Sequence, residues 1–183
     1  MRPWTIAIVL MAMAPCASAQ TGQKSSGADR TGLSTWAVDP RTGCKVFNLN
    51  PDPGDGVTWS GACQNGLAEG HGVAQWTLNG QPGDRYEGDY HVGKEHGYGV
   101  YEWKNGDRYV GNYLNNLKNG QGTYSWADGR YYVGLWKDGK AHGKGRAVFP
   151  NEVAEGNWVN GCLRENGHQV NVGTSRAECG FPP

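Results

Sequence analysis

Apolar and polar residues alternate through most of residues 44–163, in short runs separated by glycine-containing turns. Residues 99–103 read Gly-Val-Tyr-Glu-Trp and residues 109–113 read Tyr-Val-Gly-Asn-Tyr, and both alternate with the period of two that is typical of β-strands. Between them, residues 104–107 read Lys-Asn-Gly-Asp and have the composition of a turn. The pattern therefore predicts a series of β-hairpins.

The hairpins follow a fixed period. Segments 86–90, 109–113 and 132–136 share a Tyr-x-Gly-x-aromatic pattern at a step of 23 residues, and a Gly-x-Gly follows each at the same step. A degenerate copy begins at Trp59, and an incomplete copy begins at Ala154. Self-similarity at a constant step is typical of an array of one supersecondary unit. We expect four full repeats and one partial repeat over residues 57–163.

The length of each turn decides which face of the sheet the aromatic residues occupy. A two-residue Asn-Gly turn would separate Tyr101 and Trp103 from Tyr109 and Tyr113, whereas an odd loop with Gly106 in the left-handed region places all four together. We favour the odd loop, because each ring contributes about 1.5–3 kcal/mol when it is fully covered. The expected binding surface, called the ring face, is Tyr101, Trp103, Tyr109, Tyr113, Tyr124, Trp126, Tyr132 and Trp136.

The same register predicts the other residues around the ring face. Trp158 joins it, and strand glycines such as Gly99 and Gly111 leave slots in which neighbouring rings can lie flat. The residues expected on the opposite face are Val100, Glu102, Val110, Asn112, Ser125, Val133 and Leu135.

Residues 132–145 read Tyr-x-Gly-x-Trp-x-x-Gly-x-x-His-Gly-x-Gly, which resembles the MORN repeat position for position. Residues 86–99 match it with Tyr90 in the place of Trp, and residues 109–122 depart from it at Asn116 and Asn119. The resemblance implies an all-β fold, an elongated, twisted, single-layer sheet of consecutive β-hairpin (MORN) repeats. It also implies a mostly non-catalytic module for membrane or lipid binding, self-association or scaffolding.

The first 19 residues resemble a secretory signal peptide. Arg2 supplies the positive charge, residues 6–14 form a short apolar run, and residues 17–19 read Ala-Ser-Ala, which is typical of a cleavage site. Cys16 suggests a lipid-anchored alternative, but Pro15 stands where that signal has a small residue. We expect export, with a periplasmic or extracellular chain after cleavage following Ala19. The expected divisions are a signal peptide at 1–19, a disordered linker at 20–43, a capping strand and turn at 44–56, the array at 57–163 and a tail at 164–183.

Cleavage would leave four cysteines, Cys44, Cys63, Cys162 and Cys179. An even set in an exported chain is typical of disulfides. We favour Cys44–Cys63 and Cys162–Cys179, because the strands flanking the turn at residues 50–56 would bring the first two cysteines close together if they pair. Zinc is a poor alternative, since no two cysteines have CxxC spacing.

Charge and candidate chemistry narrow the function further. Lys plus Arg equals Asp plus Glu, at 17 each, so no net field attracts nucleic acid. Asp84, Asp107, Asp128 and Asp138 all lie beside turn glycines, and no pair is specified for general acid–base catalysis. His96 and His142 are two repeats apart, about 19 Å at the usual strand spacing, which is too far to share a metal. No catalytic residue, metal site or cofactor is therefore assigned.

The sequence favours an exported, non-enzymatic repeat module that binds another protein or itself, for example as a dimer. One alternative is cell-wall glycan binding, with sugar rings stacked on Trp103, Trp126 and Trp136. Another is binding of lipid headgroups, which the resemblance alone suggests.

Overall fold

The structure is a computed structural model and describes residues 35–165 and 167–182. These residues form fourteen strands and no helix. The strands are β1 (Trp36–Val38), β2 (Lys45–Phe47), β3 (Asp55–Trp59), β4 (Ala62–Gln64), β5 (Leu67–Leu78), β6 (Gln81–His91), β7 (Lys94–Glu102), β8 (Arg108–Leu114), β9 (Leu117–Ser125), β10 (Tyr131–Lys137), β11 (Lys140–Phe149), β12 (Glu152–Trp158), β13 (Cys162–Leu163) and β14 (Val170–Asn171).

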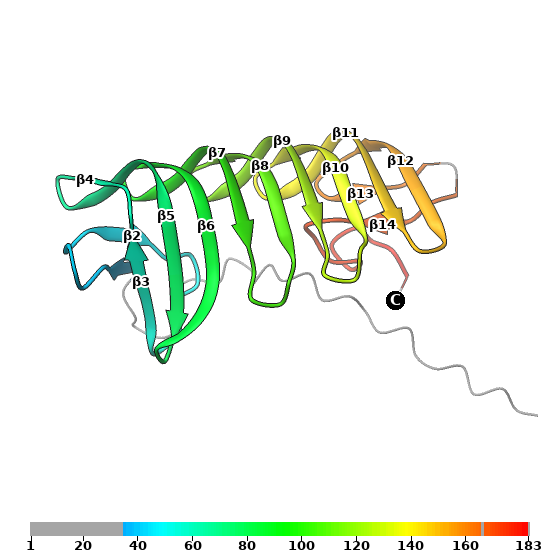
Figure 1. Ribbon diagram of the computed structural model, residues 1–183. Helices are drawn as coiled ribbons and strands as arrows, with labels where there is room; N and C mark the ends of the chain where they lie inside the picture. The colour runs from blue at the N-terminus through cyan, green and yellow to red at the C-terminus, as the bar shows by residue number, and fades with distance from the viewer. Residues whose placement is uncertain (1–34, 166, 183) are drawn as a thin grey trace, which may run out of the picture.

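Strands β5 to β12 lie side by side in chain order, each antiparallel to the next, within a sheet of twelve strands (Figure 1). Short turns between consecutive strands favour this order, because a tight turn joins antiparallel neighbours. The strands curve in the same sense, so the sheet forms an elongated trough (Figure 1). The all-β, single-layer array of hairpins expected from the sequence is confirmed.

The hairpin turns have the expected odd length. Trp103 N–H donates to the carbonyl of Asp107, Gly106 N–H donates to the carbonyl of Trp103, both at 2.9 Å, and Gly106 has a φ of 90°. Tyr101 consequently lies opposite Tyr109. The turn after Trp126 repeats these hydrogen bonds one repeat later. The predicted sidedness is confirmed, since every other residue of these strands points to the ring face.

A row of glycines crosses the sheet where the strands bend. Its members face one another in consecutive strand pairs and are Gly72, Gly88, Gly99, Gly111, Gly122, Gly134, Gly145 and Gly156. The ring of Tyr109 lies on this row, so a Cβ added at Gly122 would collide with its hydroxyl. The Tyr109 hydroxyl also donates to the carbonyl of Asn112 at 3.2 Å, beside a β-bulge. Tyr86 and Tyr132 repeat the arrangement, so the slots predicted for the rings are present.

The N-terminal cap differs from the expected hairpin. Strand β2 pairs with β1 and meets β5 in parallel, while β3 pairs with β5, so the segments flanking residues 50–56 do not pair with each other. The carboxylate of Asp39 accepts a hydrogen bond from Trp59 N–H at 3.0 Å and binds Arg41 Nη2 at 2.9 Å. Burial alone would raise the pKa of Asp39, but these hydrogen bonds lower it to about 2. The charged carboxylate thus joins the segment after β1 to the end of β3.

The expected linker also ends earlier than predicted. Trp36 begins β1, and its ring packs edge-on against Phe47 with centroids 5.1 Å apart. Residues 36–43 therefore belong to the cap. The remainder of the expected linker up to residue 34, and the expected signal peptide, lie outside the described residues.

The C-terminal tail closes the other end of the trough. Strand β13 pairs with β14, and the side chains of Val172 and Phe181 are buried. Ala141 N–H donates to the carbonyl of Val172 at 3.3 Å, which attaches the tail to the array. The tail is thus packed on the ring face near β12.

Both expected cysteine pairs are bonded, with Cα atoms 5.7 Å apart for Cys44–Cys63 and 5.6 Å apart for Cys162–Cys179. Replacing both cysteines of either pair by serine is expected to lower the free energy of unfolding by about 3 kcal/mol in the chain-entropy model. The loops are similar in length, 19 and 17 residues, so the two double variants should lose similar amounts. Denaturant titration of the oxidised protein measures the loss, and free thiols at all four positions in non-reducing peptide mapping would contradict the pairing.

Candidate functional site

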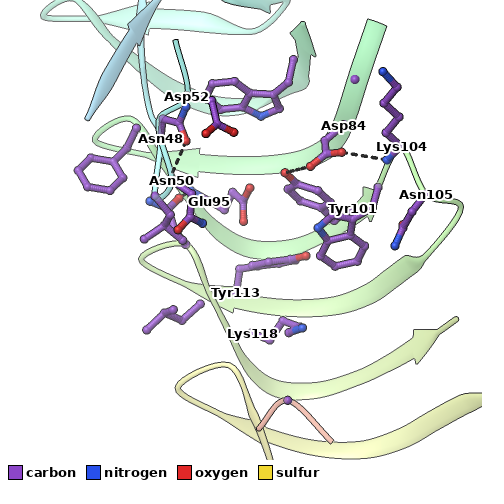
Figure 2. Close-up of a pocket in the computed structure, with 18 of the residues that line it drawn as sticks. Asn48, Asn50, Asp52, Asp84, Glu95, Tyr101, Lys104, Asn105, Tyr113 and Lys118 are labelled. Carbon is purple, nitrogen blue, oxygen red and sulfur yellow. Dashed lines mark hydrogen bonds between the residues drawn. The ribbon is translucent and has the colours of Figure 1, made fainter. Parts of the chain in front are cut away.

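A pocket of about 740 Å³ lies on the ring face in the middle of the array (Figure 2). Strands β5 to β9 supply its floor, residues 47–50 of the cap supply one wall, and residues 173–175 of the tail supply another. Ligand sites in proteins usually have volumes of about 300–1,000 Å³. This pocket, called the groove below, is the candidate site.

Most of the ring face is packed as a core. Six of its eight side chains are buried, and neighbouring rings meet edge to face, as for Tyr109 and Trp136 with centroids 5.4 Å apart. Tyr101 and Trp103 are half-buried and line the groove together with Trp76, which the sequence analysis did not select. A binding role for the ring face stays a prediction, and its open ring surface belongs mainly to these three side chains. The six buried members are Tyr109, Tyr113, Tyr124, Trp126, Tyr132 and Trp136.

One repeat position changes its chemistry inside the groove. The buried residue two places before the first glycine of each Gly-x-Gly is Ala68 in the first repeat and Ala141 in the fourth, but Glu95 and Lys118 in the middle repeats. Glu95 is 8% exposed and Lys118 is 5% exposed. Neither residue was predicted as a site residue from the sequence, although the repeats, compared position by position, have two opposite charges where the outer repeats have alanine.

Lys118 lies among aromatic rings. Its ammonium is 4.6 Å from the ring centroid of Tyr124, 4.7 Å from that of Trp136 and 5.4 Å from that of Trp103. Burial lowers the pKa of Lys118 to about 7, although the nearby carboxylates of Glu95 and Asp107 favour the charged form. The rings stabilise the ammonium by cation–π attraction.

Glu95 has the opposite shift and fewer partners. Burial raises the pKa of its carboxyl group to about 8, against the effect of Lys118. Its backbone N–H donates to Asn116 Oδ1 at 2.7 Å, and its carbonyl accepts from Asn116 N–H at 3.0 Å. Among residues 35–165 and 167–182, none forms a hydrogen bond or an ion pair with the Glu95 carboxyl group.

Two further polar groups of the groove lining are unpaired. The Tyr113 hydroxyl and Asn116 Nδ2 are buried and lack a hydrogen-bond partner within the described chain. Buried polar groups of native proteins are nearly always hydrogen-bonded, and an unpaired one is destabilising. Figure 2 shows Glu95, Tyr113 and Lys118 together on the floor. The floor of the groove therefore contains two unpaired buried polar groups in addition to the Glu95 carboxyl group.

The turn aspartates have structural partners. Asp107 accepts from the Tyr124 hydroxyl at 2.6 Å and from Ala127 N–H at 3.0 Å. Asp84 likewise accepts from the Tyr101 hydroxyl at 3.1 Å, one repeat earlier. Each carboxylate therefore connects its own turn to the next hairpin, which extends the turn role expected from the sequence.

The histidines are spread along the sheet. His71 Nδ1 is 3.0 Å from Asp89 and His91 Nδ1 is 2.9 Å from Glu69, on exposed surface. The described residues contain no group of three or more His, Cys, Asp or Glu side chains that could hold a metal ion. They also contain no helix long and apolar enough to cross a membrane.

The fold and the groove define a single-sheet repeat protein in which each hairpin adds one segment to a ring-lined trough. The MORN repeat model matches residues 64–77, 86–108, 109–129 and 132–152, so these four segments are repeats of the MORN repeat family. MORN repeats are generally protein- or lipid-interaction modules and are typically non-enzymatic. A comparison with curated proteins gives no match. The two disulfides are compatible with an oxidising, exported location.

Proposed function

We propose that this chain is an exported, non-enzymatic interaction module that receives a segment of a partner protein in the groove. The proposal rests on Glu95 and Lys118, which lie in the groove at the repeat position that alanine occupies in the outer repeats. Burying these charges destabilises the fold, and the alanines of the outer repeats show that the backbone does not need them. A destabilising polar cluster confined to a pocket is typical of a binding site.

Two features support the location and the scaffolding role. The apolar run and Ala-Ser-Ala pattern of residues 1–19 favour export, and two disulfides suit an oxidising compartment. At the far end of the array, Val153 and Val159 are 45% and 54% exposed on and beside β12, the last long strand of the sheet. Exposed apolar residues at a sheet edge favour self-association as a second contact of the module.

Glycan binding is the second candidate. Trp76, Tyr101 and Trp103 present half-open rings in the groove, and aromatic faces suit sugars. Tryptophan fluorescence titrated with cell-wall polysaccharide tests this candidate. Anionic lipid headgroups have less support, because six acidic residues and three lysines line the groove. These nine residues are Asp52, Asp55, Asp84, Glu95, Asp138, Glu178, Lys104, Lys118 and Lys140.

Site-specific photo-crosslinking tests the proposed function. A benzophenone amino acid at Lys104, an exposed residue of the groove rim, should crosslink to a protein in native envelope, whereas one at Val133 on the opposite face should not. Both positions are exposed, so the label itself should leave the sheet intact. Equal crosslinking from both positions, or none from Lys104, would contradict the groove as the docking surface. Light scattering at several concentrations measures self-association separately.

A further inference from the structure

We infer that the groove takes a basic segment of the partner protein and that the Glu95 carboxylate binds a lysine or arginine side chain of that segment. The inference rests on the proposed function and adds the chemistry of the partner. It follows from the charge of the groove lining, the unpaired state of Glu95 and the open rings beside it.

The lining is acidic although the whole chain is neutral. The six acidic residues and three lysines give the lining a formal charge of 3 − 6 = −3 when all are ionised, against a net charge of zero for the chain. A pocket lined mainly by one sign of charge attracts ligands of the opposite sign. The lining therefore favours a cationic segment over an anionic one.

Three of the acidic residues already have donors within the protein, since Asp84 accepts from the Tyr101 hydroxyl at 3.1 Å. Asp55 accepts from Asn48 Nδ2 at 2.8 Å, and Glu178 accepts from the Thr174 hydroxyl at 2.8 Å. Lys118 is stabilised by its surrounding rings. Glu95 differs, because it is the buried member of the six and no donor side chain of the described residues contacts its carboxyl group. An incoming ammonium or guanidinium would supply that donor.

The rings beside Glu95 suit the same ligand. Tyr101 and Trp103 lie 4.4 Å apart between ring centroids and are half-buried, so part of their surface faces the groove. A cation over an aromatic face gains about 0.5–2 kcal/mol, and the aliphatic stem of Lys or Arg packs on the same surface. Figure 2 shows Tyr101 and Glu95 on the two sides of one space. A side chain entering there would meet a carboxylate and a ring together.

If Glu95 binds a cationic side chain, the affinity for that side chain should depend on pH. The groups that act on Glu95 are Lys118 from β9 and Asp84 from β6. Beside it lie the phenols of Tyr113 on β8, Tyr101 on β7, and Tyr86 and Tyr90 on β6. Because burial raises the pKa of Glu95 to about 8, its carboxyl group is mostly protonated in the free protein at pH 7. A bound cation favours the carboxylate, so binding releases a proton, and affinity falls as the pH is lowered below about 8.

Octalysine and octaglutamate are suitable probes, titrated against the purified chain at about 0.15 M salt to screen long-range attraction. Octalysine should bind and octaglutamate should not. Glu95→Gln should weaken octalysine binding about tenfold or more, because it removes a buried charge that the ligand contacts. Glu155→Gln makes the same substitution on the exposed, opposite face of β12 and should alter binding by less than about twofold.

Calorimetry of the unchanged protein gives a second measurement that does not require a variant to fold. At pH 7, the heat of octalysine binding should differ between buffers of different ionisation enthalpy and show proton release. Equal weakening by Glu95→Gln and Glu155→Gln, absence of proton release, or saturation by cell-wall polysaccharide with no octalysine binding would overturn the inference. If the label at Lys104 still crosslinks to a protein but octalysine binding does not depend on Glu95, the proposed function stands and the assignment of a cationic ligand is wrong.

Discussion

Trp126→Ala is expected to lower the free energy of unfolding by about 3–5 kcal/mol, the range for removing a buried tryptophan. The Trp126 ring is 8% exposed, lies 4.9 Å from the ring of Tyr124, and has the guanidinium of Arg130 at 5.2 Å. Alanine would leave a cavity between two repeats, because rings fixed by the turns on either side cannot move in to fill it. Denaturant titration monitored by far-UV circular dichroism measures the loss.

Ser125→Ala is the matched control. Ser125 is the preceding residue of β9 and points to the opposite face of the sheet, so its hydroxyl lies outside the ring face. Its replacement should change the free energy of unfolding by no more than about 0.5 kcal/mol. Equal losses for the two variants would mean that the assignment of the faces is wrong, and the groove with it.

The fold was predictable because one short pattern recurs with a constant step. The odd number of residues in each turn decides which side chains share a face, since only an odd turn places Tyr101 and Tyr109 together. The structure has that turn. The slots under the tyrosines followed from glycines inside alternating strands, at Gly99 and Gly111. These features depend on neighbours within one or two repeats, so local sequence contains the information.

The N-terminal cap was not predictable in the same way. Its topology depends on the Asp39 carboxylate, which contacts the backbone of Trp59 twenty residues later. No repeat pattern marks such a contact, and Asp39 stands in a polar segment typical of a linker. The pairing of Cys44 with Cys63 was predicted correctly although the hairpin used to argue it is absent.

The groove was predictable only in part. The ring face includes the surface on which the groove lies, but the burial of most rings leaves Tyr101 and Trp103 as its half-open members. Glu95 and Lys118 could have been found from their column in the repeat, where alanine stands in the outer repeats. The walls of the groove could not have been predicted from the repeats, because they come from the cap and the tail, which lie outside the repeat pattern.

Gly122→Val is expected to lower the free energy of unfolding by about 3 kcal/mol or more, the upper end of the range for overpacking. A Cβ at Gly122 would collide with the hydroxyl and ring of Tyr109. That ring cannot turn away, because its hydroxyl is hydrogen-bonded to Asn112 and its edge packs on Trp136. The clash would therefore displace the tyrosine that covers the glycine row at the bend of the sheet.

Gly83→Ala provides the control for the loss of a glycine as such. Its nearest neighbour for an added Cβ is the carbonyl oxygen of Trp76 at 3.4 Å, and it lies outside the glycine row. The free energy of unfolding of this variant should lie within about 1 kcal/mol of that of the unchanged protein, because the substitution alters only the backbone entropy. If Gly122→Val were equally mild, the tyrosine would not be held against the row, and the curvature of the trough would need another cause. A large loss at Gly122 alone would show that these backbone slots maintain the bend and, with it, the groove that the bend encloses.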